Sequence, residues 1–214
     1  MIILEKTEVN GWEAAIRGMR NPYNSWDKSD SYRTENEVHV GEKDMERMIS
    51  LVRAGSDHSK FMRMITVTVD IKAPLYWWKE FDTYKVGTVR NSCSTMHKIA
   101  DKEFTLEDFS VTDFDVDDDY NEISFRDMLT NVVADCEFLR KKYLATNDKK
   151  YWRGLIQLLP SNYNQRSTVQ LNYQVLRNMY HARKNHKLDE WHVFSKWIES
   201  LPYSELITGG SKNE

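Results

Sequence analysis

The sequence predicts an α/β protein, and three features support this prediction. The chain has 214 residues, a length typical of one domain that buries a sizeable core. Residues 65–71 alternate between β-branched apolar and polar side chains, the two-residue period of a half-buried strand. Residues 42–54 and 124–145 instead repeat their apolar side chains every three to four positions, as amphipathic helices do.

Composition and charge exclude several classes of protein. Apolar residues make up 40% of the chain against eight Gly and four Pro, which excludes collagen-like and wholly disordered chains. The apolar runs are far shorter than a bilayer requires, and Glu5 follows Met1–Leu4 too soon for a signal peptide, so we expect no membrane partner. The net charge of −3 predicts no nucleic-acid partner. Two cysteines form no disulfide framework, which indicates a reduced, cytoplasmic protein.

The first third of the chain predicts a strand, a helix, a loop and a second helix. We expect the strand at 2–4 and the first helix at 12–19. Residues 21–39 are rich in Asn, Ser, Asp, Tyr and Pro and predict a loop. The helix over 42–54 then ends at Gly55, a residue that commonly terminates helices.

The middle of the chain predicts a central strand followed by aromatic and acidic segments. The strand over 65–71 ends at Pro74, and the aromatic-rich segment 75–81 continues as a helix. Aspartates and phenylalanines alternate through 101–122, where a calcium loop starting at Asp113 would need Gly at its sixth position and Glu at its twelfth. Those positions hold Asp and Ser, so we interpret the stretch as a solvated acidic loop.

The C-terminal third predicts two helices. The first runs over about 167–184, with Asn172 and Arg183 on one face because eleven residues make almost three turns. This helix either presents both polar groups to a ligand or carries an exposed Arg beside an ordinary core stripe. The second helix covers 188–201 and ends at Pro202.

Common catalytic and metal-binding motifs are absent from the sequence. It contains no GxGxxG, P-loop, HExxH or GxSxG pattern, and the six histidines lack zinc-ligand spacing, so we expect no metal site. Residues 91–95 form a small polar run with Lys79, Lys85 and Arg90 nearby. Such a run either wraps a phosphate or makes an ordinary turn. Cys93 lies within it, but a nucleophilic role would need a base that the sequence does not identify.

Two blocks of the sequence resemble the flavin-dependent thymidylate synthases, also called thymidylate synthase complementing proteins. The first block spans 54–97, with Gly55 and His58 before a strand, then Lys-Ala-Pro and an aromatic segment. The second runs from Leu158 to the helix that holds Glu190 and Trp191. Within it, the spacing from Pro160 through Asn172 and Asn178 to Arg183 matches the family without a gap.

The chain departs from the family at its signature loop. The family pattern R-H-R-x-x-S is replaced over residues 83–88, where Lys85 retains a charge and Thr88 a hydroxyl. Glu80 stands where the family has a substrate-binding Gln, and Gln174 where it has a second Arg. Each lost Arg removes a fork of donors suited to phosphate and carbonyl oxygens. The resemblance thus implies a divergent member with a degenerate loop.

The resemblance implies a fold, a site and an activity. The expected fold is α/β (α+β), a mixed sheet flanked by long helices in one domain over 1–214. The resemblance implies that FAD is bound by His58, Asn172, Asn178 and Lys85. It implies that the substrate is bound by Arg183, Arg90, Asn91, Ser94 and Glu80. Arg183, which holds the pyrimidine, is also the implied catalytic residue.

The implied reaction is methylation of dUMP to dTMP, or of a close pyrimidine nucleotide. Methylenetetrahydrofolate would supply the carbon and NADPH would reduce the flavin, in a cytoplasmic homotetramer. One alternative is a divergent homologue without synthase activity that binds or modifies nucleotides. Another is a purely structural oligomer. Retained flavin colour distinguishes these functions.

Overall fold

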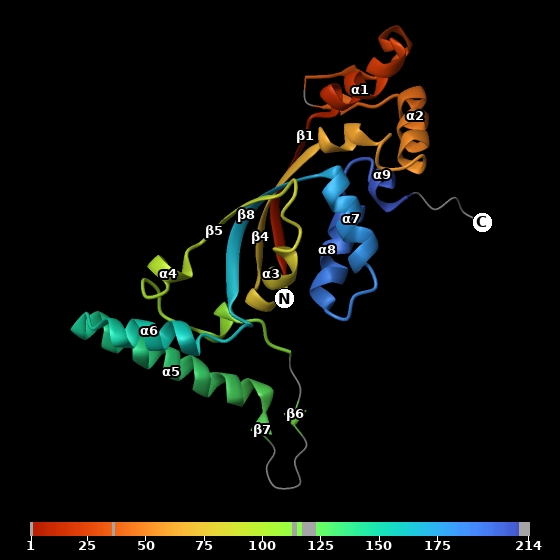
Figure 1. The fold of residues 1–214 in the computed structure, drawn as a ribbon. Coiled ribbons are helices and arrows are strands. Elements are labelled where there is room, and N and C mark those ends of the chain that lie inside the picture. The colour runs from red at the N-terminus through yellow and green to blue at the C-terminus, as the bar shows by residue number, and fades with distance from the viewer. Residues whose placement is uncertain (1, 36, 113–114, 117–122, 210–214) are drawn as a thin grey trace. The chain divides into compact units, whose positions relative to one another are not determined.

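The computed structural model describes residues 2–35, 37–112, 115–116 and 123–209, and its centre is a four-stranded sheet (Figure 1). The strand order is β1 (Ile3–Asn10), β4 (Thr66–Pro74), β8 (Asn164–Asn172) and β5 (Val89–Ser92). Helices make up most of the remaining regular structure, which confirms the predicted α/β (α+β) class.

The chain divides into two compact units, and four of the five boundaries fall within the strands of this sheet, while the fifth lies between α3 (Leu75–Phe81) and β5. The first unit comprises Met1–Ile3, Lys72–Asp82 and Asn91–Ser167. The second comprises Leu4–Ile71, Thr83–Arg90 and Thr168–Glu214.

Strand β4 confirms the strand expected at 65–71. Val67, Val69 and Ile71 are fully buried and alternate with half-buried polar residues. The strand ends at Pro74, as the sequence indicates, and α3 follows at once. This helix is the aromatic segment, and it buries two tryptophans and a phenylalanine.

Strand β1 is longer than the predicted 2–4. It reaches Asn10, although residues 5–8 are polar and exposed. Because β1 is the last strand in the sheet order, backbone pairing with one neighbour is enough to extend it, and apolar alternation is not required.

Strand β8 corrects the prediction of a helix beginning near Ser167. The segment Asn164–Asn172 is extended, and Ser167, Val169 and Leu171 are buried in alternation with exposed residues. Helix α7 begins only afterwards and covers Tyr173–Arg183. The two-residue period of this strand is visible in the sequence. Because the helical spacing of apolar residues in α7 follows it directly, the boundary between the strand and the helix is not evident from the sequence.

The predicted helices of the second unit are confirmed as α1 (Trp12–Arg20), α2 (Glu42–Arg53) and α8 (Asp189–Glu199). Helix α7 packs against α8, against the short helix α9 (Glu205–Thr208) and against the 3-10 turn Lys60–Arg63.

The predicted loop 21–39 contains short regular pieces. They are two 3-10 turns, Asn21–Tyr23 and Trp26–Lys28, and a small antiparallel hairpin of β2 (Tyr32–Arg33) and β3 (Val38–His39).

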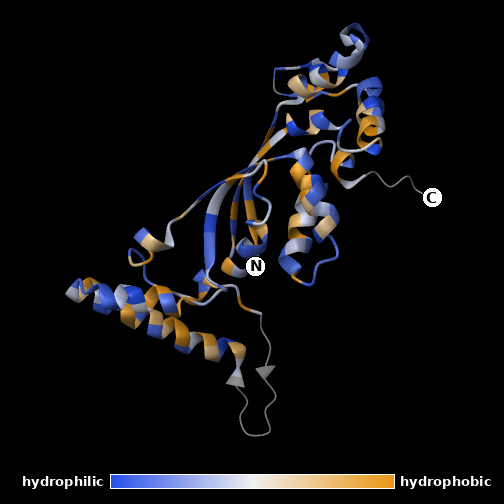
Figure 2. Ribbon diagram, in the orientation of Figure 1, coloured by the Kyte–Doolittle hydropathy of each residue, from blue (hydrophilic) through white to orange (hydrophobic). Residues whose placement is uncertain are grey.

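The first unit is built around a helical hairpin of α5 (Phe125–Thr146) and α6 (Lys149–Leu158), on which apolar and polar residues alternate (Figure 2). Its shorter elements are α4 (Thr95–Lys98), a 3-10 turn at Leu106–Asp108 and the paired strands β6 (Asp115–Val116) and β7 (Ile123–Ser124). Its buried core consists of Ile99, Ala100, Phe104, Phe109, Leu129, Val133, Cys136 and Leu155.

Much of the acidic loop predicted within 101–122 lies outside the described residues, at 113–114 and 117–122. Within the described ranges, no helix combines the length and apolar character needed to cross a bilayer.

A charged cluster joins α5 to the segment before the 3-10 turn at Leu106–Asp108. Arg140 donates from Nε and Nη2 to the Glu137 carboxylate, each at 2.7 Å. The Phe104 backbone N–H donates to the same carboxylate at 3.1 Å. The hydrogen bonds from Arg140 lower the pKa of Glu137 to about 2, against the opposing effect of burial.

Glu137→Gln should lower the free energy of unfolding at pH 7 by about 2–3 kcal/mol, because the carboxylate is favoured in the folded state. The folded pKa lies below the unfolded one, so this stability is present above pH 4.5 and is lost as the pH falls toward about 2. Urea unfolding at several pH values measures the effect. The exposed Glu107 provides the control Glu107→Gln, and equal pH profiles in both variants would contradict the assignment.

Candidate functional site

Arg183 lies against two aromatic side chains that contact each other at the C-terminal end of α7. Its Nε donates to the Tyr84 hydroxyl at 3.0 Å. Its guanidinium carbon is 5.0 Å from the Trp191 ring centroid and 5.7 Å from that of Tyr84, and the two rings meet edge-on with their centroids 6.4 Å apart. Both separations from the guanidinium are within cation–π range, so the aromatic pair forms one surface on which the guanidinium rests.

The aromatic surface behind Arg183 is rigid. Trp191, in the first turn of α8, is fully buried and contacts Phe194 edge-on at 5.6 Å. The His186 ring lies 6.2 Å from Trp191, and its Nδ1 accepts a hydrogen bond from the Leu188 N–H at 3.1 Å. Since the aromatic residues are fixed, the orientation of the guanidinium is fixed as well.

The segment 83–88 also meets the N-terminal end of α7. Gly87 has a φ of +78°, and a Cβ at this position would lie 2.8 Å from the Asn172 Nδ2 and 3.1 Å from the Val175 side chain. Only glycine fits such a close approach in the left-handed region. Tyr84 is at the other end of α7, so this loop spans the helix from Asn172 to Arg183.

Asn172 differs from the prediction in its local role. It caps α7 rather than forming part of the helix, and its Oδ1 accepts the Val175 N–H at 3.0 Å. Asn172 lies at one end of the helix, as expected. The predicted continuous helical stripe from Asn172 to Arg183 is wrong, because the residues before 173 are extended.

A second polar group lies along another face of α7. The Ser59 hydroxyl donates to the Gln174 Oε1 at 3.1 Å, and the Gln174 Nε2 donates to the Asn178 Oδ1 at 3.2 Å. His58 precedes Ser59 and is exposed. Asn178 and Arg183 are five residues apart on the helix, about 140° around its axis. Ser59 and Gln174 thus connect to the predicted flavin residue Asn178 on a side of α7 away from Arg183.

Two further predicted residues lie in the same unit. Lys85 is exposed, and within the described part of the chain its ammonium makes no ion pair. Arg90 is half-buried in β5. Both follow Tyr84 closely, which makes them the cations adjacent to the Arg183 cluster along the chain.

Three predicted residues belong to the first unit. Glu80 is half-buried on α3, and Asn91 is exposed in β5. Ser94 is the N-cap of α4 and accepts the His97 N–H at 3.2 Å, so the polar run 91–95 contains a strand end and a helix cap.

Tyr84, Trp191, Ser59 and Gln174 were not predicted as site residues. At Tyr84 and Gln174 the chain lacks the cations that the resemblance leads us to expect. The loss of a cation does not indicate that these side chains hydrogen-bond to predicted site residues. A hydroxyl facing Arg183 and an amide linking Ser59 to Asn178 follow from the tertiary structure.

The arrangement can bind a flat, polar ring. A guanidinium oriented by an aromatic pair offers donors to a carbonyl oxygen or an anion. The Ser59–Gln174–Asn178 group offers neutral amide and hydroxyl groups, which suit the nitrogen and oxygen atoms of a heterocycle. These donor sets fit the isoalloxazine ring of a flavin better than they fit its phosphates.

The sequence matches no protein-family profile and no curated protein. Solved structures do match in fold. The structure of flavin-dependent thymidylate synthase ThyX from Helicobacter pylori complexed with FAD and dUMP aligns with a TM-score of 0.72 and 17% identity, covering 97% of this chain and 98% of that one. A second structure of ThyX from H. pylori with FAD and dUMP gives 0.69 and 17%, covering 97% of each chain.

A third match is a protein named for a different activity. The UMP/dUMP methylase PolB from Streptomyces cacaoi, bound with 5-Br dUMP, aligns with a TM-score of 0.61 and 14% identity, over 98% of this chain and 94% of that one. The chain therefore has the fold of flavin-dependent thymidylate synthases, as the resemblance implied.

Proposed function

We propose that this protein binds a pyrimidine nucleotide and a flavin and methylates the nucleotide base, with dUMP as substrate. The observation that supports this most is the position of Arg183, held against Tyr84 and Trp191 at the end of α7, in a fold shared with structures that contain FAD and dUMP. We further propose a homotetramer, as the resemblance implies.

In this proposal Arg183 binds and polarises the base. Its guanidinium donates to a uracil carbonyl and stabilises negative charge that develops on that oxygen when the ring is attacked. Trp191 and Tyr84 fix the direction of the donors, so little reorganisation accompanies the reaction. Within the unit that holds Arg183, the proposed contacts to the remainder of the nucleotide are Lys85 and Arg90.

His58, Asn172 and Asn178 would hold the flavin, with Gln174 and Ser59 orienting the Asn178 amide. When bound, a reduced flavin supplies hydride, and NADPH and methylenetetrahydrofolate would be the co-substrates. The Ser59, Gln174 and Asn178 side chains would contribute hydrogen bonds to the ring and no charge.

A second candidate function is nucleotide binding without synthase activity. Gln174 favours it, because this residue is neutral and engaged with Ser59 and Asn178 where the resemblance places an Arg. An oriented donor of that kind is worth about 3–4 kcal/mol of activation barrier. Binding can therefore persist while turnover is slow.

The decisive experiment measures flavin retention and proton release together. The purified protein should show the blue absorption band of oxidised FAD, and dUMP tritiated at C5 should release tritium to water when NADPH, FAD and methylenetetrahydrofolate are supplied. Tritium release at background, with FAD and dUMP binding demonstrated, would contradict the synthase function and leave the second candidate. A colourless protein that binds neither FAD nor dUMP would contradict both.

Lys85 provides a charge test of the nucleotide site. Lys85→Ala should weaken dUMP binding about 3-fold at low salt, since one solvated charge contributes about 0.5–1 kcal/mol at this range. The salt dependence of the dissociation constant should flatten, and Lys85→Ala/Arg90→Ala should flatten it further. Titration calorimetry at two ionic strengths measures both effects. Lys43→Ala, at an exposed lysine of α2 in the same unit, is the control. Equal affinity of the double variant and the wild type at low salt would contradict the role.

A further inference from the structure

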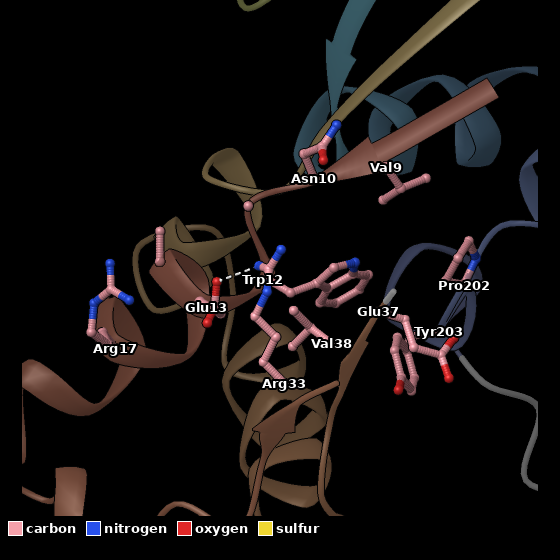
Figure 3. A pocket seen from close by; sticks show the side chains of 12 residues that line it. Val9, Asn10, Trp12, Glu13, Arg17, Arg33, Glu37, Val38, Pro202 and Tyr203 are labelled. Carbon is pink, nitrogen blue, oxygen red and sulfur yellow. Dashed lines mark hydrogen bonds and ion pairs between the residues drawn. The ribbon is translucent and has the colours of Figure 1, made fainter. Parts of the chain in front are cut away.

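A cavity of about 510 Å³ lies in the second unit, away from α7 (Figure 3). It is bounded by the end of β1, the first turn of α1, the β2–β3 hairpin and the segment Pro202–Tyr203. This volume is in the range of about 300–1,000 Å³ typical of small-molecule sites. None of the predicted site residues lines it.

The first turn of α1 presents backbone donors to this cavity. Gly11 occupies the N-cap position and supplies no side-chain acceptor. The Ala15 N–H bonds to the Gly11 carbonyl at 3.0 Å, whereas the N–H groups of residues 12–14 precede the first intrahelical bond. These groups are the positive end of the helix dipole, which favours an anion.

Trp12 adds an independent donor. Its side chain is only 6% exposed, and in Figure 3 the indole extends from the start of α1 toward Pro202 and Tyr203. Among the described residues, nothing accepts a hydrogen bond from its N–H. The indoles of Trp78 and Trp197, by contrast, donate to the Gln165 carbonyl and the Thr7 hydroxyl, each at 3.0 Å. The Trp12 N–H is not fully enclosed by protein, so a ligand or water in the cavity can accept from it.

The ring of Trp12 is fixed by its neighbours. Tyr173 contacts it edge-on at 5.2 Å and Tyr203 at 4.9 Å. Tyr203 has a φ of +53°, a left-handed conformation that is uncommon for an aromatic residue. Its hydroxyl accepts the Val40 N–H at 2.9 Å, which holds the residue at the cavity edge.

The charges on the wall distinguish one end of the cavity. Arg33 donates to Glu13 at 2.9 Å, so these two charges largely cancel. Arg17, one turn further along α1, is exposed and makes no ion pair within the described part of the chain. A free guanidinium thus lies beside the uncapped first turn, while Glu37 lines the wall contributed by the hairpin.

We propose that this cavity binds a small anion, a carboxylate or a phosphate monoester, that carries an apolar or aromatic ring. The anion would accept from the first turn of α1 and from Arg17, and the Trp12 N–H would donate to it or to a polar atom of the ring. The ring would lie against Val9, Val38 and Pro202. This site is independent of the nucleotide function proposed for Arg183.

The test titrates the full chain, with ¹⁵N-labelled tryptophan, with phenyl phosphate and separately with phenylacetate. We expect one of the seven indole signals, that of Trp12, to shift and saturate, with a dissociation constant on the order of 1 mM for so small a probe. The stronger of the two probes identifies the anion. Trp12→Phe assigns the signal, and Arg17→Met should weaken binding about 10-fold.

Two further variants keep the result interpretable if Trp12→Phe fails to fold. Ala14→Leu adds bulk to the cavity wall and retains a strong helix former, so it should abolish the shift. Arg153→Met removes an exposed arginine of the other unit and should change nothing. Failure of both probes to saturate any indole signal, or equal binding by wild type, Arg17→Met and Ala14→Leu, would overturn the proposal.

Discussion

Asp44→Ala should lower the free energy of unfolding by about 3–5 kcal/mol, since it leaves a buried arginine without its counter-charge. Asp44 is fully buried in the first turn of α2, and Arg20, at the end of α1, is 4% exposed. The Arg20 Nε donates to the Asp44 Oδ1 at 2.6 Å. Removing one partner of such a pair is much more costly than removing both.

Hydrogen bonds to the segment after α1 raise this cost further. Ser29 and Ser31 donate to the other oxygen of Asp44, at 2.5 and 2.6 Å. Arg20 donates from Nη1 to the Ser25 carbonyl at 2.9 Å and from Nη2 to the Lys28 carbonyl at 3.0 Å. Burial raises the pKa of Asp44, but these hydrogen bonds outweigh it and lower the pKa. The residues after α1 thus depend on one saturated charge network.

Denaturant unfolding measures the loss, and two variants separate its causes. Asp27→Ala removes an exposed aspartate from the same segment and should change stability by less than about 0.5 kcal/mol. Asp44→Leu/Arg20→Met should be less destabilised than Asp44→Ala, because no charge remains buried. If Asp44→Ala behaves like Asp27→Ala, the network does not hold this segment.

Local sequence patterns predicted most helices and the central strand. They succeed where one face is buried, as for β4 with Val67, Val69 and Ile71. They fail where backbone pairing alone forms a strand, as in the polar and exposed part of β1. They also fail where a two-residue period passes directly into a helical one, as at the boundary of β8 and α7. The hairpin β2–β3 has two-residue strands, too short for any periodicity.

The candidate site was predictable in part for a different reason. The spacing from Asn172 to Arg183 marks the two ends of α7, and the structure finds loop 83–88 at both. The partners of Arg183 come from segments about a hundred residues apart, Tyr84 and the helix that follows α7. The sequence indicates that Tyr84 replaces a cation, but only the fold brings its hydroxyl to a guanidinium.

Arg183→Ala should weaken dUMP binding by about 30-fold to 4,000-fold, because loss of a charged, oriented donor set costs about 2–5 kcal/mol. Arg183→Lys keeps the charge but not the fork and should fall between the wild type and Ala. Tyr84→Phe removes only the hydroxyl that fixes Nε, so it should cost about 1 kcal/mol, or about 5-fold. Calorimetric titration with dUMP gives all three dissociation constants.

Stability without ligand separates a binding role from a structural one. Loss of the contacts with Trp191 and Tyr84 should lower the unfolding free energy of the ligand-free Arg183→Ala protein by about 1 kcal/mol. In the wild type, dUMP at a hundred times its dissociation constant should add about 2.7 kcal/mol, and the same concentration should add less than about 1 kcal/mol to the variant. Lys184→Ala, at the adjacent exposed cation over Tyr180, should retain the full increment. If Arg183→Ala instead retains this increment and loses several kcal/mol without ligand, Arg183 supports the packing of α7 against α8 and does not bind the nucleotide.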